Sequence, residues 1–144
     1  MATINQAQIL YPIAVLVALV MLMTVLMLRE RVQEMKARRI HPQKVATSTQ
    51  MAGVLQNTRA ADNYKNLFEM PVLFYVCCLA LLALQAVTPL LLGLAWAYVA
   101  LRLLHSFIHV GYNKVMHRFN VFALSALVLL VMWVLLVAHL LQRI

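Results

Sequence analysis

The sequence predicts an all-α integral membrane protein, a bundle of four helices that run up, down, up and down. Of its 144 residues, 65% are hydrophobic and only 11% are charged, whereas an ordinary soluble domain is less than about half apolar and about a quarter charged. The apolar residues lie in four long runs instead of at amphipathic spacing, which is typical of membrane spans. The length fits one domain, so we expect a single membrane domain over residues 1–144.

Each apolar run is long enough for a helix, which rises about 1.5 Å per residue, to cross a hydrocarbon core of about 30 Å. The first run is interrupted only by Tyr11, Pro12 and Thr24, and the fourth only by Ser125 and His139. The first run lacks the charged start and the cleavage site of a signal peptide, so we expect it to remain in the mature protein. The four spans are expected at about residues 9–28, 67–87, 89–110 and 121–141.

The connections between the spans differ in length. The first connection is long, at about residues 30–65, and the first helix should continue into it as far as His41, because the residue before Pro42 is pushed out of the helical region. A further helical stretch is expected from about Asn57. The second connection, residues 85–89, is so short that the second and third spans must form a tight antiparallel hairpin.

The basic residues are placed where membrane topology needs them. The chain carries 12 Lys and Arg against 4 Asp and Glu, a formal charge of +8, and eight of the twelve lie between the first and second apolar runs. An excess of Lys and Arg marks the cytoplasmic side, so the first and third connections are expected there and both termini on the other side. These cations favour contact with the anionic headgroups of membrane lipids. The sequence lacks a basic surface interspersed with aromatic residues, so no nucleic-acid partner is expected. The lack of a retention or transit signal favours a bacterial inner membrane.

Ionisable residues within membrane spans are costly and are therefore candidates for a functional site. Asp62, Asn66 and Glu69 are spaced by four and three residues, which places them on one face of a helix. The third span carries a second such stripe, and further polar residues lie at the same depth. We expect both stripes to line one pocket at the cytoplasmic ends of the spans. The second stripe consists of Arg102, His105, His109 and Tyr112, and the further residues are Lys65, Lys114 and Arg118.

Other interpretations of these residues remain open. Glu69 and Arg102 could pair, so that each is tolerated between helices, and His105 could be a packed hydrogen-bond donor. His105 and His109, four residues apart, could bind zinc or iron with Glu69 as a third ligand. Because Arg102 on the same stripe would repel a cation, no metal is expected.

Two segments carry motifs of a known family. Arg59-Ala-Ala-Asp-Asn-Tyr-Lys-Asn66-Leu-Phe-Glu69-Met-Pro71 and Arg102-x-x-His105, followed by His109 and Arg118, stand in the second, third and fourth spans. These motifs resemble those of the MAPEG superfamily, the membrane-associated proteins in eicosanoid and glutathione metabolism. The resemblance covers the whole chain, with four spans, a long first connection and a tight second one. The chain is similar in particular to bacterial-type microsomal glutathione transferases.

The resemblance implies a homotrimer of four-helix bundles that binds glutathione between subunits near the cytoplasmic face. It implies that Asn66 and Glu69 hold the peptide, with Glu69 pairing the γ-glutamyl amine. Arg118 would be the catalytic residue: it cannot act as a base, but it can stabilise the thiolate that attacks a hydrophobic electrophile. The other residues of the implied glutathione site are Lys65, Arg29 or Arg31, Arg102, His105, His109 and Tyr112.

The chain departs from the family pattern at three positions. His109 stands where the eicosanoid enzymes have tyrosine, Asp62 where several relatives have an arginine, and Phe119 where prostaglandin E synthase has serine. The leading hypothesis is a membrane-bound glutathione-dependent transferase or peroxidase that acts on a hydrophobic small molecule. The alternatives are a non-catalytic lipid-binding or scaffold protein of the same fold and a histidine metal site. A small multidrug exporter also has four spans, but its usual acid in the first span is missing here.

Overall fold

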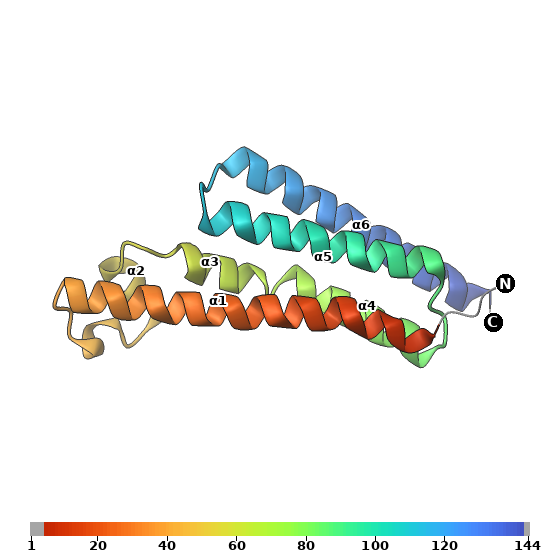
Figure 1. Ribbon diagram of the computed structural model, residues 1–144, viewed down its shortest axis with the longest axis horizontal. Helices are drawn as coiled ribbons and strands as arrows, with labels where there is room; N and C mark the ends of the chain where they lie inside the picture. Colours follow the sequence, from red (N-terminus) through yellow and green to blue (C-terminus); the bar gives the residue numbers. More distant parts are fainter. Residues whose placement is uncertain (1–4, 143–144) are drawn as a thin grey trace.

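The computed structural model describes residues 5–142, and the regular structure within them is entirely helical. Figure 1 shows the long helices running alternately up and down, so that the start of α1 and the end of α6 lie at the same end of the molecule. The prediction of an all-α four-helix bundle is confirmed. The α-helices are α1 (Leu10–Ala37), α2 (Ser48–Val54), α3 (Arg59–Asn66), α4 (Met70–Ala83), α5 (Pro89–Val110) and α6 (Val115–Leu141), and the 3-10 helices are η1 (Gln6–Ile9) and η2 (Pro42–Val45).

Four helical stretches of the described chain are long and apolar enough to cross a membrane. Their outward side chains are largely apolar and exposed, for example Leu22 at 52% and Phe107 at 69%. Such apolar faces suit contact with lipid, and within each helix the backbone N–H and C=O groups are hydrogen-bonded to one another, as a hydrocarbon core requires. The chain is therefore an integral membrane protein. The four stretches are Gln6–Ala37, Arg59–Ala83, Pro89–Val110 and Val115–Leu141.

The second stretch is broken at the start of the span that the sequence predicts at about residues 67–87, and α3 is the further helical stretch expected from about Asn57. Residues 67–69 separate α3 from α4, and Glu69 has φ −94° and ψ −94°, outside the helical region. Pro71 explains the break, because proline has no backbone N–H to donate and its ring clashes with the carbonyl four residues earlier, that of Leu67. The break places the Glu69 carboxylate at a bend in the helix.

Two helix ends also differ from expectation. α1 ends at Ala37, before the expected His41, because Arg39 adopts the left-handed conformation with φ 52° and closes the helix. α6 begins at Val115, well before the expected fourth span, after Asn113 has turned the chain with φ 51°. The first turns of α6 therefore extend the helix beyond its apolar part.

α5 lies at the centre of the bundle and packs against α1, α3 and α6. Tyr98 of α5 stacks on Phe74 of α4 with ring centroids 4.5 Å apart, and both side chains are fully buried. Leu16 of α1 and Leu129 of α6 belong to the same hydrophobic core. Because these neighbours cover the inner face of α5, polar residues on that face lie within the bundle.

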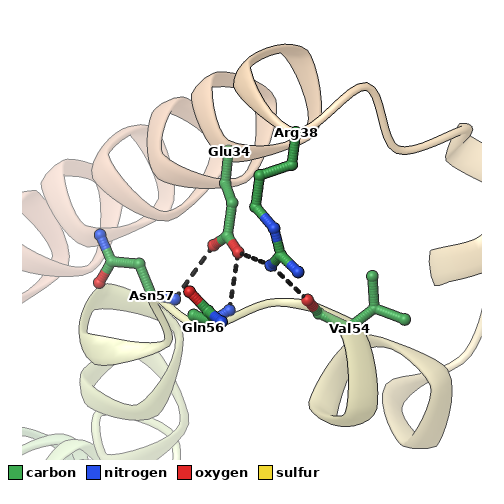
Figure 2. A network of polar contacts seen from close by, with 5 residues as sticks. All are labelled: Glu34, Arg38, Val54, Gln56 and Asn57. Carbon is green, nitrogen blue, oxygen red and sulfur yellow. Dashed lines mark hydrogen bonds and ion pairs between the residues drawn. The ribbon is translucent and has the colours of Figure 1, made fainter.

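One carboxylate ties the end of the first connection to α1 (Figure 2). Glu34 accepts the backbone N–H of Gln56 at 2.8 Å, the N–H of Asn57 at 3.0 Å and the guanidinium of Arg38 at 2.6 Å. Arg38 also donates to the carbonyl of Val54, the last residue of α2, at 2.6 Å. These bonds hold the segment between α2 and α3 against α1.

Glu34→Ala should free this segment without unfolding the bundle. The variant removes the acceptor of two backbone N–H groups, so the amides of Gln56 and Asn57 lose their protection. Hydrogen–deuterium exchange in detergent micelles should become faster in residues 54–58 and stay unchanged in α4 and α5. The matched control is Gln33→Ala, an exposed neighbour on the same helix, which should behave like the unaltered protein; equal exchange in both variants would contradict the tether.

Candidate functional site

Polar side chains gather at one end of the bundle, which we call the basic end because it carries the first and third connections. They form two groups. The inner polar cluster is buried among the helices, whereas the outer stripe lies on α3 and at the bend before α4. The inner polar cluster consists of Asn63, Arg102, His105, Ser106 and His109, and the outer stripe consists of Asp62, Lys65, Asn66 and Glu69.

Arg102 is the one cation of the inner polar cluster. Its side chain is 0% exposed, and its guanidinium carbon lies 5.3 Å from the centre of the Tyr98 ring and 5.0 Å from that of Phe122. Its Nε donates to the Tyr98 hydroxyl at 3.1 Å, but Nη1 and Nη2 have no acceptor within the described residues. A buried charge is normally paired and hydrogen-bonded. Arg102 therefore offers a fork of free N–H donors that suits a carboxylate or another anion.

The two histidines of the cluster lie next to each other, with ring centroids 5.7 Å apart. His105 Nδ1 lies 3.2 Å from the carbonyl oxygen of Arg118; because a carbonyl can only accept, Nδ1 carries the proton. His105 Nε2 and His109 Nδ1 have no partner in the part of the chain that the structure describes. Glu69, the third ligand of the metal alternative, is exposed, and residues 5–142 contain no group of three His, Cys, Asp or Glu that could hold a metal.

Asn63 and Ser106 belong to the cluster but are not among the residues selected from the sequence. The Ser106 hydroxyl donates to Asn63 Oδ1 at 3.3 Å and so links α5 to α3. Asn63 is fully buried together with Ala60 and Leu67, which are three residues before it and four after it. That spacing places the three residues on one face of the helix. An asparagine between two apolar residues on the same face was the signal in the sequence that could have identified Asn63.

The outer stripe lies apart from the inner polar cluster. Because Asn63 is on the buried face of α3, the stripe faces outward: Asp62, Lys65 and Glu69 are exposed and Asn66 is partly buried. The structure therefore does not bring the two expected stripes together within one chain. Glu69 and Arg102 do not pair, and the one ion pair among residues 5–142 joins Arg38 to Glu34.

The remaining predicted residues lie around the start of α6 and the end of α1. Arg118 is partly buried, and its Nη1 donates to Asn113 Oδ1 at 2.8 Å. Tyr112 is exposed and shares a hydrogen bond of 3.1 Å with His117 Nδ1. Lys114 and Arg29 are exposed. The structure thus places Arg118 beside the inner polar cluster, through its carbonyl, and Tyr112 outside it.

A small hollow of about 100 Å³ lies between α1, α2 and α3 at the basic end. Arg31 and Lys65 supply its cations, and Asp62 and Thr58 also line it. The Thr58 hydroxyl donates to Asp62 at 2.8 Å, so the acid is already engaged. Arg31 and Lys65 make no ion pair within the described residues and can hold a carboxylate. Of the two first-helix arginines implied by the resemblance, Arg31 lines this hollow and Arg29 does not.

Comparison with known families shows to which family the chain belongs. Residues 9–138 match the model of the MAPEG family, which is most of the chain. The chain belongs to the MAPEG family. Its members are membrane proteins that generally use glutathione, so the resemblance in the second, third and fourth spans is confirmed at the level of the family. No curated protein and no solved structure gives a significant match.

The residues of this MAPEG chain fit glutathione, a peptide with two carboxylates, one amine and one thiol. The free Nη1 and Nη2 donors of Arg102 suit an anionic group of the ligand. Arg31 and Lys65 suit a carboxylate, and the exposed Glu69 suits the amine. Donors and acceptors of the right charge are thus present, but in one chain they face different directions.

Proposed function

We propose that this protein is a membrane-bound glutathione-dependent transferase or peroxidase that acts on hydrophobic electrophiles. The observation that carries the proposal is the buried guanidinium of Arg102, two of whose nitrogens have no partner among residues 5–142 of this MAPEG chain. A charge buried without a counter-ion is unfavourable, and an anionic ligand removes that cost by accepting the free N–H groups. Phe122, which is partly buried and covers the guanidinium, is the side chain that must move to admit the ligand.

The charged residues lie on two different sides of the bundle, which supports a site shared between copies of the chain. The inner polar cluster holds the unpaired cation, and the outer stripe exposes Glu69 and Lys65 on another side of the bundle. A ring of subunits in which the outer stripe of one copy meets the α5–α6 side of the next would join the two halves. This is the homotrimer that the resemblance implies, with the second and third spans contributing to each site from different copies.

Each residue then has a role that its chemistry allows. Glu69 and Asn66 bind the γ-glutamyl end, and Lys65 with Arg31 binds a carboxylate. Arg102 and His105 donate to the ligand from the other side, His109 and Tyr112 complete the wall, and Arg29 lies near its edge. Bound glutathione supplies the thiolate, and Arg118 favours the thiolate over the thiol because a nearby cation stabilises the negative sulfur.

The surroundings of the site fit this reaction. The first and third connections carry most of the cations, so we place them in the cytoplasm and both termini on the other side of the membrane. Glutathione is present in the cytoplasm. The hydrophobic substrate reaches the site from the membrane, which we take to be a bacterial inner membrane. The whole of residues 1–144 acts as one membrane domain.

A non-catalytic lipid-binding protein of the same fold is the second candidate. It is favoured by His109, a buried imidazole that stands where the eicosanoid enzymes have a tyrosine. A phenol can donate to a thiolate, whereas the His109 ring packs against His105. The two candidates differ in whether bound glutathione is ionised.

An ultraviolet difference titration of the detergent-purified protein with glutathione separates them. We expect a saturable thiolate band at neutral pH, which S-methylglutathione does not give. Arg118→Ala should lose most of the band while calorimetry still detects binding, because the variant removes the cation at the sulfur and keeps the residues that bind the peptide. Arg39→Ala, an exposed arginine at the end of α1, is the matched control. The absence of a thiolate band from the unaltered protein, whether or not calorimetry detects glutathione binding, would favour the non-catalytic protein.

A further inference from the structure

An apolar groove of about 380 Å³ runs between α1 and α5 at the side of the bundle. Leu22 and Leu26 line it from α1, and Leu103 and Phe107 line it from α5. Leu22 and Phe107 are more than half exposed, so the groove opens outward. At this depth the outside of the bundle is lipid.

The groove offers no free polar group to a ligand. Ser106 is the polar side chain that lines it, and its hydroxyl already donates to Asn63. On this side the lining extends from Leu103 of α5 to Gly111, the residue after the end of the helix, which corresponds to about 12 Å along the helix axis. The groove therefore suits a stretch of hydrocarbon chain that lies parallel to the helices.

Cations flank the mouth of the groove at the basic end. Arg59 Nη1 donates to the carbonyl of Gly111 at 3.0 Å, which places its guanidinium at the end of the groove. Arg29 follows Leu26 by three residues and Leu22 by seven, so it continues the same stripe of α1. Glu30, the adjacent acid, accepts the backbone N–H of Ala60 at 3.3 Å and so faces α3.

We propose that this groove binds one acyl chain of an anionic glycerophospholipid, with the lipid phosphate held by Arg59 and Arg29. The phosphate diester has several acceptor oxygens and can bridge two guanidinium groups. We favour a bilayer phospholipid because the groove opens outward between two spanning helices and its cations lie at the basic end, which we place at the cytoplasmic leaflet, where anionic lipids are enriched. The groove shares only Ser106 with the inner polar cluster, and the Ser106 hydroxyl is already engaged by Asn63. It includes neither Arg31 nor Lys65 of the hollow, and Arg29 is the one residue that it shares with the wall of the proposed glutathione site.

Native mass spectrometry of the protein in detergent tests the proposal by titration with phosphatidylglycerol and with phosphatidylcholine of the same chain length. The unaltered protein should prefer phosphatidylglycerol. Arg59→Gln should weaken phosphatidylglycerol binding by about fivefold, the effect of one arginine near the headgroup, and leave phosphatidylcholine unchanged. Leu22→Trp should weaken both lipids, because it fills the groove. Arg39→Gln makes the same charge change away from the groove and should have no effect.

Three results would overturn the proposal. Equal loss in Arg59→Gln and Arg39→Gln would mean that only net charge matters. Displacement of phosphatidylglycerol by equimolar oleate would assign the groove to a free fatty acid. Efficient disulfide formation between copies of Leu22→Cys would mean that a second copy of the chain covers the groove. Both Arg59 and Leu22 are exposed, so their variants should keep the helical circular dichroism of the unaltered protein.

Discussion

Replacing Arg102 with methionine should leave the stability of the protein in the absence of glutathione unchanged or higher, and it should abolish the stabilisation that glutathione provides. The guanidinium is 0% exposed, and two of its nitrogens have no partner within the described residues. Replacing buried ionic groups with apolar groups of similar volume is often neutral or stabilising, by about 1–4 kcal/mol. The lost hydrogen bond from the charged guanidinium to Tyr98 offsets this by about 1.5–3 kcal/mol. Removing one partner of a buried charged contact costs a ligand about 2–5 kcal/mol or more.

Thermal unfolding in detergent, with and without glutathione, measures both effects in one experiment. At a ligand concentration of about 100 times Kd, binding should stabilise the unaltered protein by about 2.7 kcal/mol, and Arg102→Met should show almost none of this. Arg102→Lys keeps the charge but not the planar fork and should fall between the two. Arg39→Met, at an exposed position, should change neither quantity. If Arg102→Met instead lowers the unfolding temperature and keeps the glutathione effect, Arg102 is a structural residue.

The four-helix fold could be predicted from the sequence because long apolar runs have few structural solutions in a membrane. A helical stretch from about Asn57 ahead of the second span was predicted, but the bend at residues 67–69 was not, although Pro71 was visible in the expected span. Hydropathy measures how apolar a segment is and carries no information on its backbone. The break depends on a missing N–H and a clash with the carbonyl of Leu67, so proline had to be considered separately.

The candidate site could be predicted in part. The spacing of Arg102, His105 and His109 places them on one face of the helix, whatever the orientation of the helix in the bundle. The structure buries all three side chains. Spacing alone does not decide which face of α3 is inside. That choice depends on packing against α1 and α5, which selects the face of Asn63 and leaves Glu69 outside.

Two variants that each fail to bind glutathione should recover binding when they assemble together. Glu69→Gln disables the outer stripe, and Arg102→Met disables the inner polar cluster. If each site combines the outer stripe of one copy with the inner polar cluster of the next, a mixed ring contains sites in which both halves are intact. With equal amounts and random assembly about a quarter of all sites are of this kind, and in trimers that contain both variants the share rises to about a third. Differently tagged chains, purified through both tags, can be assayed for glutathione bound per chain.

The strength of this test lies in its control. Co-assembly of Glu69→Gln with the double variant Glu69→Gln/Arg102→Met gives rings in which no copy has an intact outer stripe, so binding should stay at zero. Recovery in the first mixture but not in the second requires that the two residues act from different copies. No recovery in rings that carry both tags would place the whole site in one chain, and α3 would then have to rotate to bring Glu69 inward. Failure of the two tags to co-purify would contradict the self-association on which the shared site depends.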